Sequence, residues 1–327
     1  MKKIKIILFL AFVMVILSAC NNEAVKINLA EVTRSLFYAP QYVALEKGYF
    51  SDEGLEVDLQ TTWGGDTTMT ALLSDGADIA LVGSETSIYV YAQDSRDYAV
   101  NFAQLTKTDG TFLVSKEDNP DFSWEDMKGE KFLGQRVGGM PQMVGEYVLK
   151  QHGIDPHQDL ELNQSIDFAN IPGAFQSGDY QYVQLFEPTA SIFEQQGQGH
   201  IVASFGEESG TVPYTVFMTK QSYLEDNEDN VKKFTRAIYR AQQWVNDSSA
   251  QEIAEVIEPY FEDTDINMLT TSIERYKNQG SFSLDPILNE EAWQNLKDIM
   301  DEAGELPIDA PYTDLVNTKI AEEIMKE

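Results

Sequence analysis

Cysteine and basic side chains are scarce in this 327-residue sequence, and both shortages exclude functions. Cys20 is the single cysteine, so no intramolecular disulfide can form. Lys and Arg total 23 against 54 Asp and Glu, which gives a formal net charge of −31 at pH 7. A protein that binds nucleic acid through its own field needs clusters of basic residues, so we expect no nucleic-acid partner. The hydrophobic share of 43% excludes wholesale disorder, and the length predicts two domains.

Sequence motifs of catalysis and metal binding are also missing. We find no Gly-x-Ser-x-Gly elbow, no Walker loop and no dinucleotide fingerprint. The three histidines, His152, His157 and His200, are not paired at the helical spacing of metal ligands. We therefore expect no catalytic residue, no metal and no cofactor, and predict that the chain is not an enzyme.

The N-terminal segment has the features of a targeting signal followed by a membrane anchor. Three lysines in the first five residues precede an apolar run over 6–17, which is too short to span a bilayer but suits a signal sequence. The run ends in Leu17-Ser18-Ala19-Cys20, which resembles the bacterial lipobox. We expect 1–19 to be a signal peptide and 20–24 to be a tether with a lipid on Cys20. The protein would then sit on the extracytoplasmic face of the cell membrane; an ordinary secretory signal with a chance cysteine is the alternative.

From residue 25 onward, alternating strand and helix patterns predict the fold. Two βα series are followed, after residue 220, by helices alone. This pattern predicts an α/β protein with two mostly parallel sheets flanked by helices, and extra C-terminal helices. We expect lobe 1 to comprise 25–111 and 217–327 and lobe 2 to comprise 112–216. The hinge crossings are predicted near 112–114 and 214–219.

Several stretches resemble a known family, the solute-binding proteins for sulfonates, nitrate and thiamine pyrimidine precursors. The resemblance covers roughly residues 25–220 and is strong near 38–84, where it includes Tyr38-Ala39-Pro40, Glu46-Lys47-Gly48-Tyr49-Phe50 and Glu56-Val57. Further matching segments are 64–66, 77–80, 83–84, 137–141 and 186–190. The resemblance implies a two-lobed type II periplasmic binding protein fold. It also implies a monomer that delivers a solute to an ABC permease and, through it, to an ATPase subunit.

The candidate ligand contacts lie in turns that follow predicted strands, where α/β proteins bind ligands. Glycines there permit close backbone approach, helix starts offer free N–H groups, and aromatic rings can stack on a planar solute. The predicted residues are Phe37, Tyr38, Trp63, Gly65, Asp66, Thr67, Ser84, Glu85, Thr86, Met140, Pro141, Glu187 and Tyr214. Purely structural roles are open for several of them: Ser84 as an N-cap, Glu187 as a helix-start acid and Trp63 as a domain-edge side chain.

The chemistry of these turns favours a ligand class. An oxyanion usually needs an arginine, and of six arginines only Arg34 and Arg136 lie near the predicted cleft. The turns are instead acidic and aromatic, which favours a neutral or cationic heterocycle such as a thiamine pyrimidine precursor. An aliphatic sulfonate such as taurine, or nitrate, is the alternative ligand. A ligand-sensing lipoprotein and a secreted enzyme are alternatives of another class, although the related enzyme that makes the thiamine pyrimidine needs a cysteine-rich segment, which this chain lacks.

Overall fold

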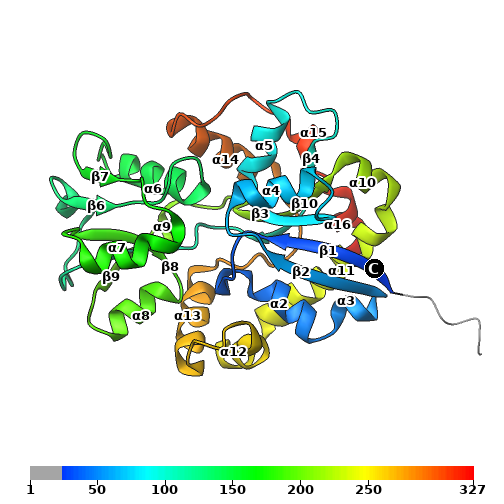
Figure 1. Cartoon of the computed structure of the whole chain (residues 1–327), viewed down its shortest axis with the longest axis horizontal. Helices are drawn as coiled ribbons and strands as arrows, with labels where there is room; N and C mark the ends of the chain where they lie inside the picture. Colours follow the sequence, from blue (N-terminus) through cyan, green and yellow to red (C-terminus); the bar gives the residue numbers. More distant parts are fainter. Residues whose placement is uncertain (1–23) are drawn as a thin grey trace, which may run out of the picture.

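The computed structural model describes residues 24–327, which fold around two five-stranded sheets (Figure 1). The first sheet has the order β2 (Leu55–Thr61), β1 (Val25–Glu31), β3 (Ile79–Gly83), β10 (Thr215–Lys220) and β4 (Ala99–Thr106). The second has the order β7 (Glu161–Asn163), β6 (Lys131–Leu133), β8 (Tyr182–Phe186), β5 (Thr111–Ser115) and β9 (His200–Ser204). The predicted signal peptide, the lipidation site Cys20 and most of the tether lie outside the described residues.

The two sheets share one plan. In the first sheet β10 pairs antiparallel with both β3 and β4, while β1 pairs parallel with β2 and β3. In the second sheet β5 pairs antiparallel with β8 and β9, while β6 pairs parallel with β7 and β8. Each sheet therefore has a single reversed strand in the fourth position. The predicted α/β class with two mostly parallel sheets is confirmed.

Helices cover both faces of the sheets, as the fold requires when parallel strands are buried on two sides. Helices that follow first-sheet strands are α2 (Ala39–Glu46), α3 (Tyr49–Asp52), α4 (Gly65–Leu73) and α5 (Glu85–Tyr91). Those of the second series are α6 (Met140–Gln151), α7 (Ile171–Ser177), α8 (Thr189–Gln195) and α9 (Phe205–Glu208). Short 3-10 turns are η2 (Leu36–Tyr38), η3 (Trp124–Met127), η4 (Phe168–Asn170) and η5 (Glu258–Tyr260).

The C-terminal part is helical, as predicted. It comprises α10 (Gln221–Asp226), α11 (Glu228–Asp247), α12 (Ala250–Ile257), α13 (Ile266–Gln279), α14 (Glu290–Glu302), α15 (Tyr312–Leu315) and α16 (Lys319–Ile324). The apolar stripe of α11, which includes Val231, Phe234 and Ile238, is fully buried and packs on α2. Helix α13 packs on α8 and α14 packs on α6, so these two helices join the first sheet's side of the molecule to the second (Figure 1).

Two connections link the sheets: the chain leaves the first sheet through 107–110 and returns through 205–214. The predicted crossings near 112–114 and 214–219 fall on β5 and β10, directly beside these connections. The ends of β3 and β8 and both connections meet in one region, which holds the candidate site. Within residues 24–327, no helix combines the length and apolar character needed to cross a membrane.

Candidate functional site

Strand β3 carries the first group of site residues. It ends at Gly83, and Ser84 and Glu85 open helix α5 immediately afterwards. The Glu85 side chain folds back over the strand end, because a Cβ on Gly83 would lie 2.1 Å from its Oε2. Any larger residue at position 83 would displace this carboxyl group. The absence of a side chain at Gly83 therefore leaves the space that the buried Glu85 carboxyl group occupies at the end of this central strand.

Two buried polar atoms in this region, Ser84 Oγ and Glu85 Oε2, find no hydrogen-bond partner among the described residues, whereas the Tyr214 hydroxyl and the Asp109 carboxyl group face each other. The Ser84 N–H donates to the Tyr214 carbonyl oxygen at 3.3 Å, and the charges of Asp109 and Glu85 both help to raise the pKa of Tyr214, after burial as the main cause. Leaving a buried polar group without a partner costs about 1–3 kcal/mol, so such a cluster calls for a partner from outside the chain.

Burial dominates the electrostatics of both acids. It raises the pKa of Glu85 to about 8, although backbone N–H groups, including that of Met140, act in the opposite direction. Burial likewise raises the pKa of Asp109 to about 6, against hydrogen bonds from Thr111 and from the Tyr214 hydroxyl. No cationic side chain of residues 24–327 contributes to either shift. The site thus holds two carboxyl groups and no compensating positive charge.

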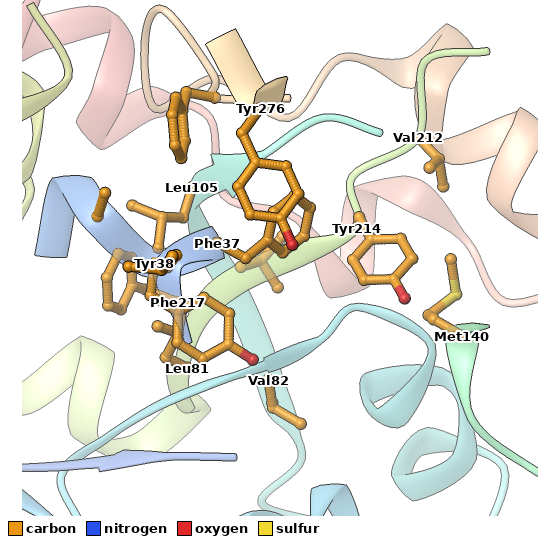
Figure 2. Close-up of a cluster of buried hydrophobic side chains, with 14 of the residues drawn as sticks. Phe37, Tyr38, Leu81, Val82, Leu105, Met140, Val212, Tyr214, Phe217 and Tyr276 are labelled. Atoms are coloured by element: carbon orange, nitrogen blue, oxygen red, sulfur yellow. The ribbon is translucent and has the colours of Figure 1, made fainter. Parts of the chain in front are cut away.

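Aromatic rings form the wall beside these acids. The Phe37 ring centroid lies 5.0 Å from that of Tyr276 and 5.6 Å from that of Tyr214, which it meets edge to face. Figure 2 shows Phe37 and Tyr276 side by side and the Tyr214 ring directed toward Met140. Gly110 lets this wall form, since a Cβ there would lie 3.0 Å from the Phe37 ring. Planar aromatic surfaces of this kind suit a flat solute.

Residues of both sheets meet across this region. Phe37 lies 6.3 Å from Phe186 between ring centroids, and the Tyr89 hydroxyl lies 3.7 Å from the Met143 sulfur. Six of the thirteen predicted ligand residues come together here and are at most 6% exposed: Phe37, Tyr38, Ser84, Glu85, Met140 and Tyr214. Thr86 is buried next to them and donates to the Gly83 carbonyl oxygen at 2.7 Å.

Other predicted residues lie at an exposed rim. Trp63 is 69% exposed and holds a φ of 58°, a conformation that large side chains rarely adopt. Asp66 and Thr67 are exposed, and Gly65 and Pro141 are half-buried. Arg136 lies 3.9 Å from Asp66 and thereby links the helix that follows β2 to the loop that precedes α6. None of these five residues is buried with the unpartnered acids.

Glu187 is buried, but both oxygens of its carboxyl group already accept hydrogen bonds from this chain. Its Oε1 accepts from Arg275 and from the Ser191 hydroxyl, both at 2.8 Å, and its Oε2 accepts from the Ser191 N–H at 3.0 Å and from Ser272 at 3.3 Å. A role for Glu187 in ligand binding stays a prediction. In this structure the residue fastens α8 to α13.

The two arginines expected near the cleft are also engaged elsewhere. Arg34 pairs with the buried Glu31 at 3.1 Å and lies over the Tyr42 and Tyr260 rings. Arg136 is mostly exposed and lies 3.5 Å from Asp167. No group of three or more His, Cys, Asp and Glu side chains in residues 24–327 is arranged to hold a metal ion.

Sequence reasoning missed two residues of the site. Asp109 stands in the connection between the sheets, and the only local signal is an acid followed by glycine directly before strand β5. Tyr276 lies on α13, and its hydroxyl donates to the Gly110 carbonyl oxygen at 3.0 Å and accepts from the Glu187 N–H at 3.1 Å. No sequence pattern near Tyr276 marks it, because only the packing of α13 brings it to the site.

The chain is similar to proteins of known sequence. Residues 20–258 match the NMT1-like family. A Bacillus subtilis (strain 168) protein that bears the name "Putative binding protein YtlA" is 63% identical over 318 residues, which cover 97% of this chain and 95% of that protein. A 4-amino-5-hydroxymethyl-2-methylpyrimidine phosphate synthase of Aspergillus parasiticus is 26% identical over 235 residues, covering 68% of this chain and 67% of the synthase.

Solved structures share the fold. A ligand-binding component of an ABC-type import system from Staphylococcus aureus matches with a TM-score of 0.73 at 15% identity, over 93% of this chain and all of that chain. The alkanesulfonate-binding protein of Xanthomonas axonopodis pv. citri, solved with MOPS, matches with a TM-score of 0.71 at 13% identity, over 90% of this chain and 99% of that one. At these identities the likeness concerns the fold, which is that of periplasmic binding proteins.

Proposed function

The chain belongs to the NMT1-like family, and from this premise we propose that it is the solute-binding component of an ABC importer. It captures a small organic solute between two lobes, 25–111 with 217–327 and 112–216, and hands it unaltered to a permease coupled to an ATPase. The names of the Bacillus subtilis relative and of the import-system structure support this function. The observation that carries it is the set of unpartnered buried polar atoms at the junction of the two sheets.

The favoured solute is a thiamine pyrimidine precursor or a similar heterocycle. Flat rings from Phe37 and Tyr276 line the site, and the acids beside them can accept hydrogen bonds from ring and amino N–H groups. The similarity to a pyrimidine phosphate synthase supports the same class. An aliphatic sulfonate, taurine or nitrate is the second candidate, supported by the alkanesulfonate-binding neighbour.

The direct test is native mass spectrometry of freshly purified protein, followed by identification of the released solute. We expect one small molecule at a 1:1 ratio and its recovery in unchanged form. Small-angle scattering with and without that solute should show compaction, because closure brings two lobes together. Conversion of the bound molecule into a product would favour the alternative of an enzyme, and the absence of any bound or bindable solute would refute a receptor.

The anchor is tested separately. We propose that Cys20 carries the lipid that holds the receptor at the extracytoplasmic face of the membrane, where tethering raises its effective concentration near the permease. Cys20→Ser should then move the protein from the membrane fraction to the soluble fraction. Retention of the Cys20→Ser variant in the membrane fraction would contradict the lipid anchor, and the proposal for the ligand site would be unaffected.

A further inference from the structure

We propose that helix α13 is a strap that must release lobe 2 before a solute can enter, so that its hydrogen bonds set how readily the solute-free receptor opens. This inference rests on the proposed function and adds a regulatory element to it. Helix α13 belongs by sequence to lobe 1, yet one of its faces bonds to lobe 2 and to the connections between the sheets. The residues of this polar face are Ser272, Arg275, Tyr276 and Gln279.

The polar face of α13 is fastened to lobe 2. Its four residues share one side of the helix, because they are spaced by three and four positions. Arg275 donates to Glu187 at 2.8 Å and to Glu194 at 3.0 Å. The Ser272 hydroxyl donates to Glu187 at 3.3 Å, and the Tyr276 hydroxyl accepts from the Glu187 N–H at 3.1 Å. These bonds tie α13 to the end of β8 and to α8.

Gln279 joins the two connections between the sheets. Its Nε2 donates to the Asp109 carbonyl oxygen at 2.6 Å, in the outgoing connection. Its Oε1 accepts from the Ser204 hydroxyl at 2.7 Å, directly before the return connection. Gly206 leaves room for this amide, because a Cβ there would lie 2.1 Å from Gln279 Nε2. A rotation of one lobe against the other bends both connections, so these bonds resist it.

An adjacent flank of α13 is held by lobe 1. Ile273 on this flank is fully buried, and the helix packs along α12. Lys277 donates to the Val245 carbonyl oxygen at 2.7 Å and ties α13 to the end of α11. The lobes can therefore separate only if one of them gives up its contacts with α13. Water can replace hydrogen bonds but not apolar packing, so the polar face is the side that releases.

Release is required because the described conformation closes the site. The six predicted ligand residues gathered there are at most 6% exposed. The unpartnered oxygens, Ser84 Oγ and Glu85 Oε2, belong to this buried group. A solute can reach them only after the lobes part, and the bonds of the strap add to the free energy of that step. The rarer the open form is, the weaker the apparent affinity becomes.

The test measures the distance between the lobes in protein freed of solute, by double electron–electron resonance between two spin labels. Cys20 is the single cysteine, so a Cys20→Ser chain with Leu73→Cys and Gln151→Cys carries one label at the exposed end of α4 and one at that of α6. In this labelled chain Gln279→Ala should raise the ratio of open to closed distances about 10-fold, because bonds to both connections are lost. Tyr276→Phe keeps the ring and should raise the ratio about 3- to 5-fold.

Gln242→Ala is the matched control. Gln242 is a buried glutamine of α11 that donates to the Gln104 carbonyl oxygen at 2.7 Å, entirely within lobe 1. Its loss should destabilise the fold and leave the distances between the lobes unchanged. Unchanged distances in both Gln279→Ala and Tyr276→Phe would overturn the strap, and so would equal widening in Gln242→Ala. Neither result would affect the transport function, which depends on recovery of a bound solute by native mass spectrometry.

Discussion

Glu85 and Glu187 occupy corresponding places in the two halves of the molecule and have different surroundings. Each follows the third strand of its sheet, β3 or β8, and each is at most 5% exposed. Glu187 has four hydrogen-bond donors, including Arg275 from α13. Glu85 Oε2 has none among residues 24–327.

The difference arises from what packs over each strand end. Helix α13 lies against α8 and brings a guanidinium to the end of β8. At the end of β3 no cation of residues 24–327 acts on Glu85, and only backbone N–H groups oppose the effect of its burial. A buried acid at a strand end is therefore not by itself a binding residue. Its role depends on whether the chain supplies the partner, and three experiments test this contrast.

The largest effect is expected at Arg275. Arg275→Ala leaves Glu187 buried with an unpaired charge, and we expect the free energy of unfolding to fall by about 3–5 kcal/mol. Chemical denaturation at neutral pH measures it. Arg240→Ala is the control, because its partner Asp52 is exposed and the loss should stay below about 1 kcal/mol. Equal losses in the two variants would show that the Glu187 pair is no more important than a surface pair.

The next effect concerns Glu85 and pH. Its folded pKa of about 8 lies above the ordinary 4.5, so the folded solute-free chain keeps a proton that the unfolded chain releases. Stability must then fall as pH rises between these two values. From pH 5 to pH 7 we expect a loss of about 2–3 kcal/mol from this group. Asp109 adds a smaller loss of the same sign, because its pKa of about 6 lies above 3.8.

Glu85→Gln removes this titration and should flatten the pH dependence of unfolding measured without solute. Glu146→Gln serves as the reference, since Glu146 is another buried acid but already accepts hydrogen bonds from Gln142 at 2.7 Å and from Gln164 at 2.9 Å. A Glu85→Gln variant with the same pH profile as the native chain would mean that Glu85 is already partnered and ionised at pH 7. The contrast with Glu187 would then disappear.

The smallest effect is expected at Gly83, the last residue of β3. Gly83→Ala places a methyl group where the Glu85 carboxyl lies, and the flexible side chain can move away at little cost to folding. We expect binding of the solute recovered from the purified protein to weaken about 5- to 10-fold while stability changes by less than about 1 kcal/mol. Gly173→Ala, where the added Cβ meets nothing within 4 Å, is the control. Unchanged binding in Gly83→Ala would remove Glu85 from the site.

Local sequence could predict part of this site. Ser84 and Glu85 follow an apolar strand and a glycine, and parallel strands place such turns at a binding edge. The same reasoning predicted Glu187 with equal force, and it could not see that Arg275, 88 residues later, would occupy that acid. Asp109 was missed because it lies in a connection between the sheets and not after a predicted βα strand. Trp63 and Asp66 were predicted with the others, yet they lie exposed at the rim.

The order of strands and helices was determined by the sequence itself, because the period of apolar residues depends only on near neighbours along the chain. The acidic composition and the shortage of arginine likewise pointed to a neutral or cationic solute. Which acids remain without a cation was decided by tertiary structure alone. That outcome depends on where α13 packs and on how the two connections fold, and both are contacts between segments far apart in the sequence. Burial then sets the charge of Glu85 and Asp109, since the cost of a carboxylate depends on everything around it and not on its neighbours in the chain.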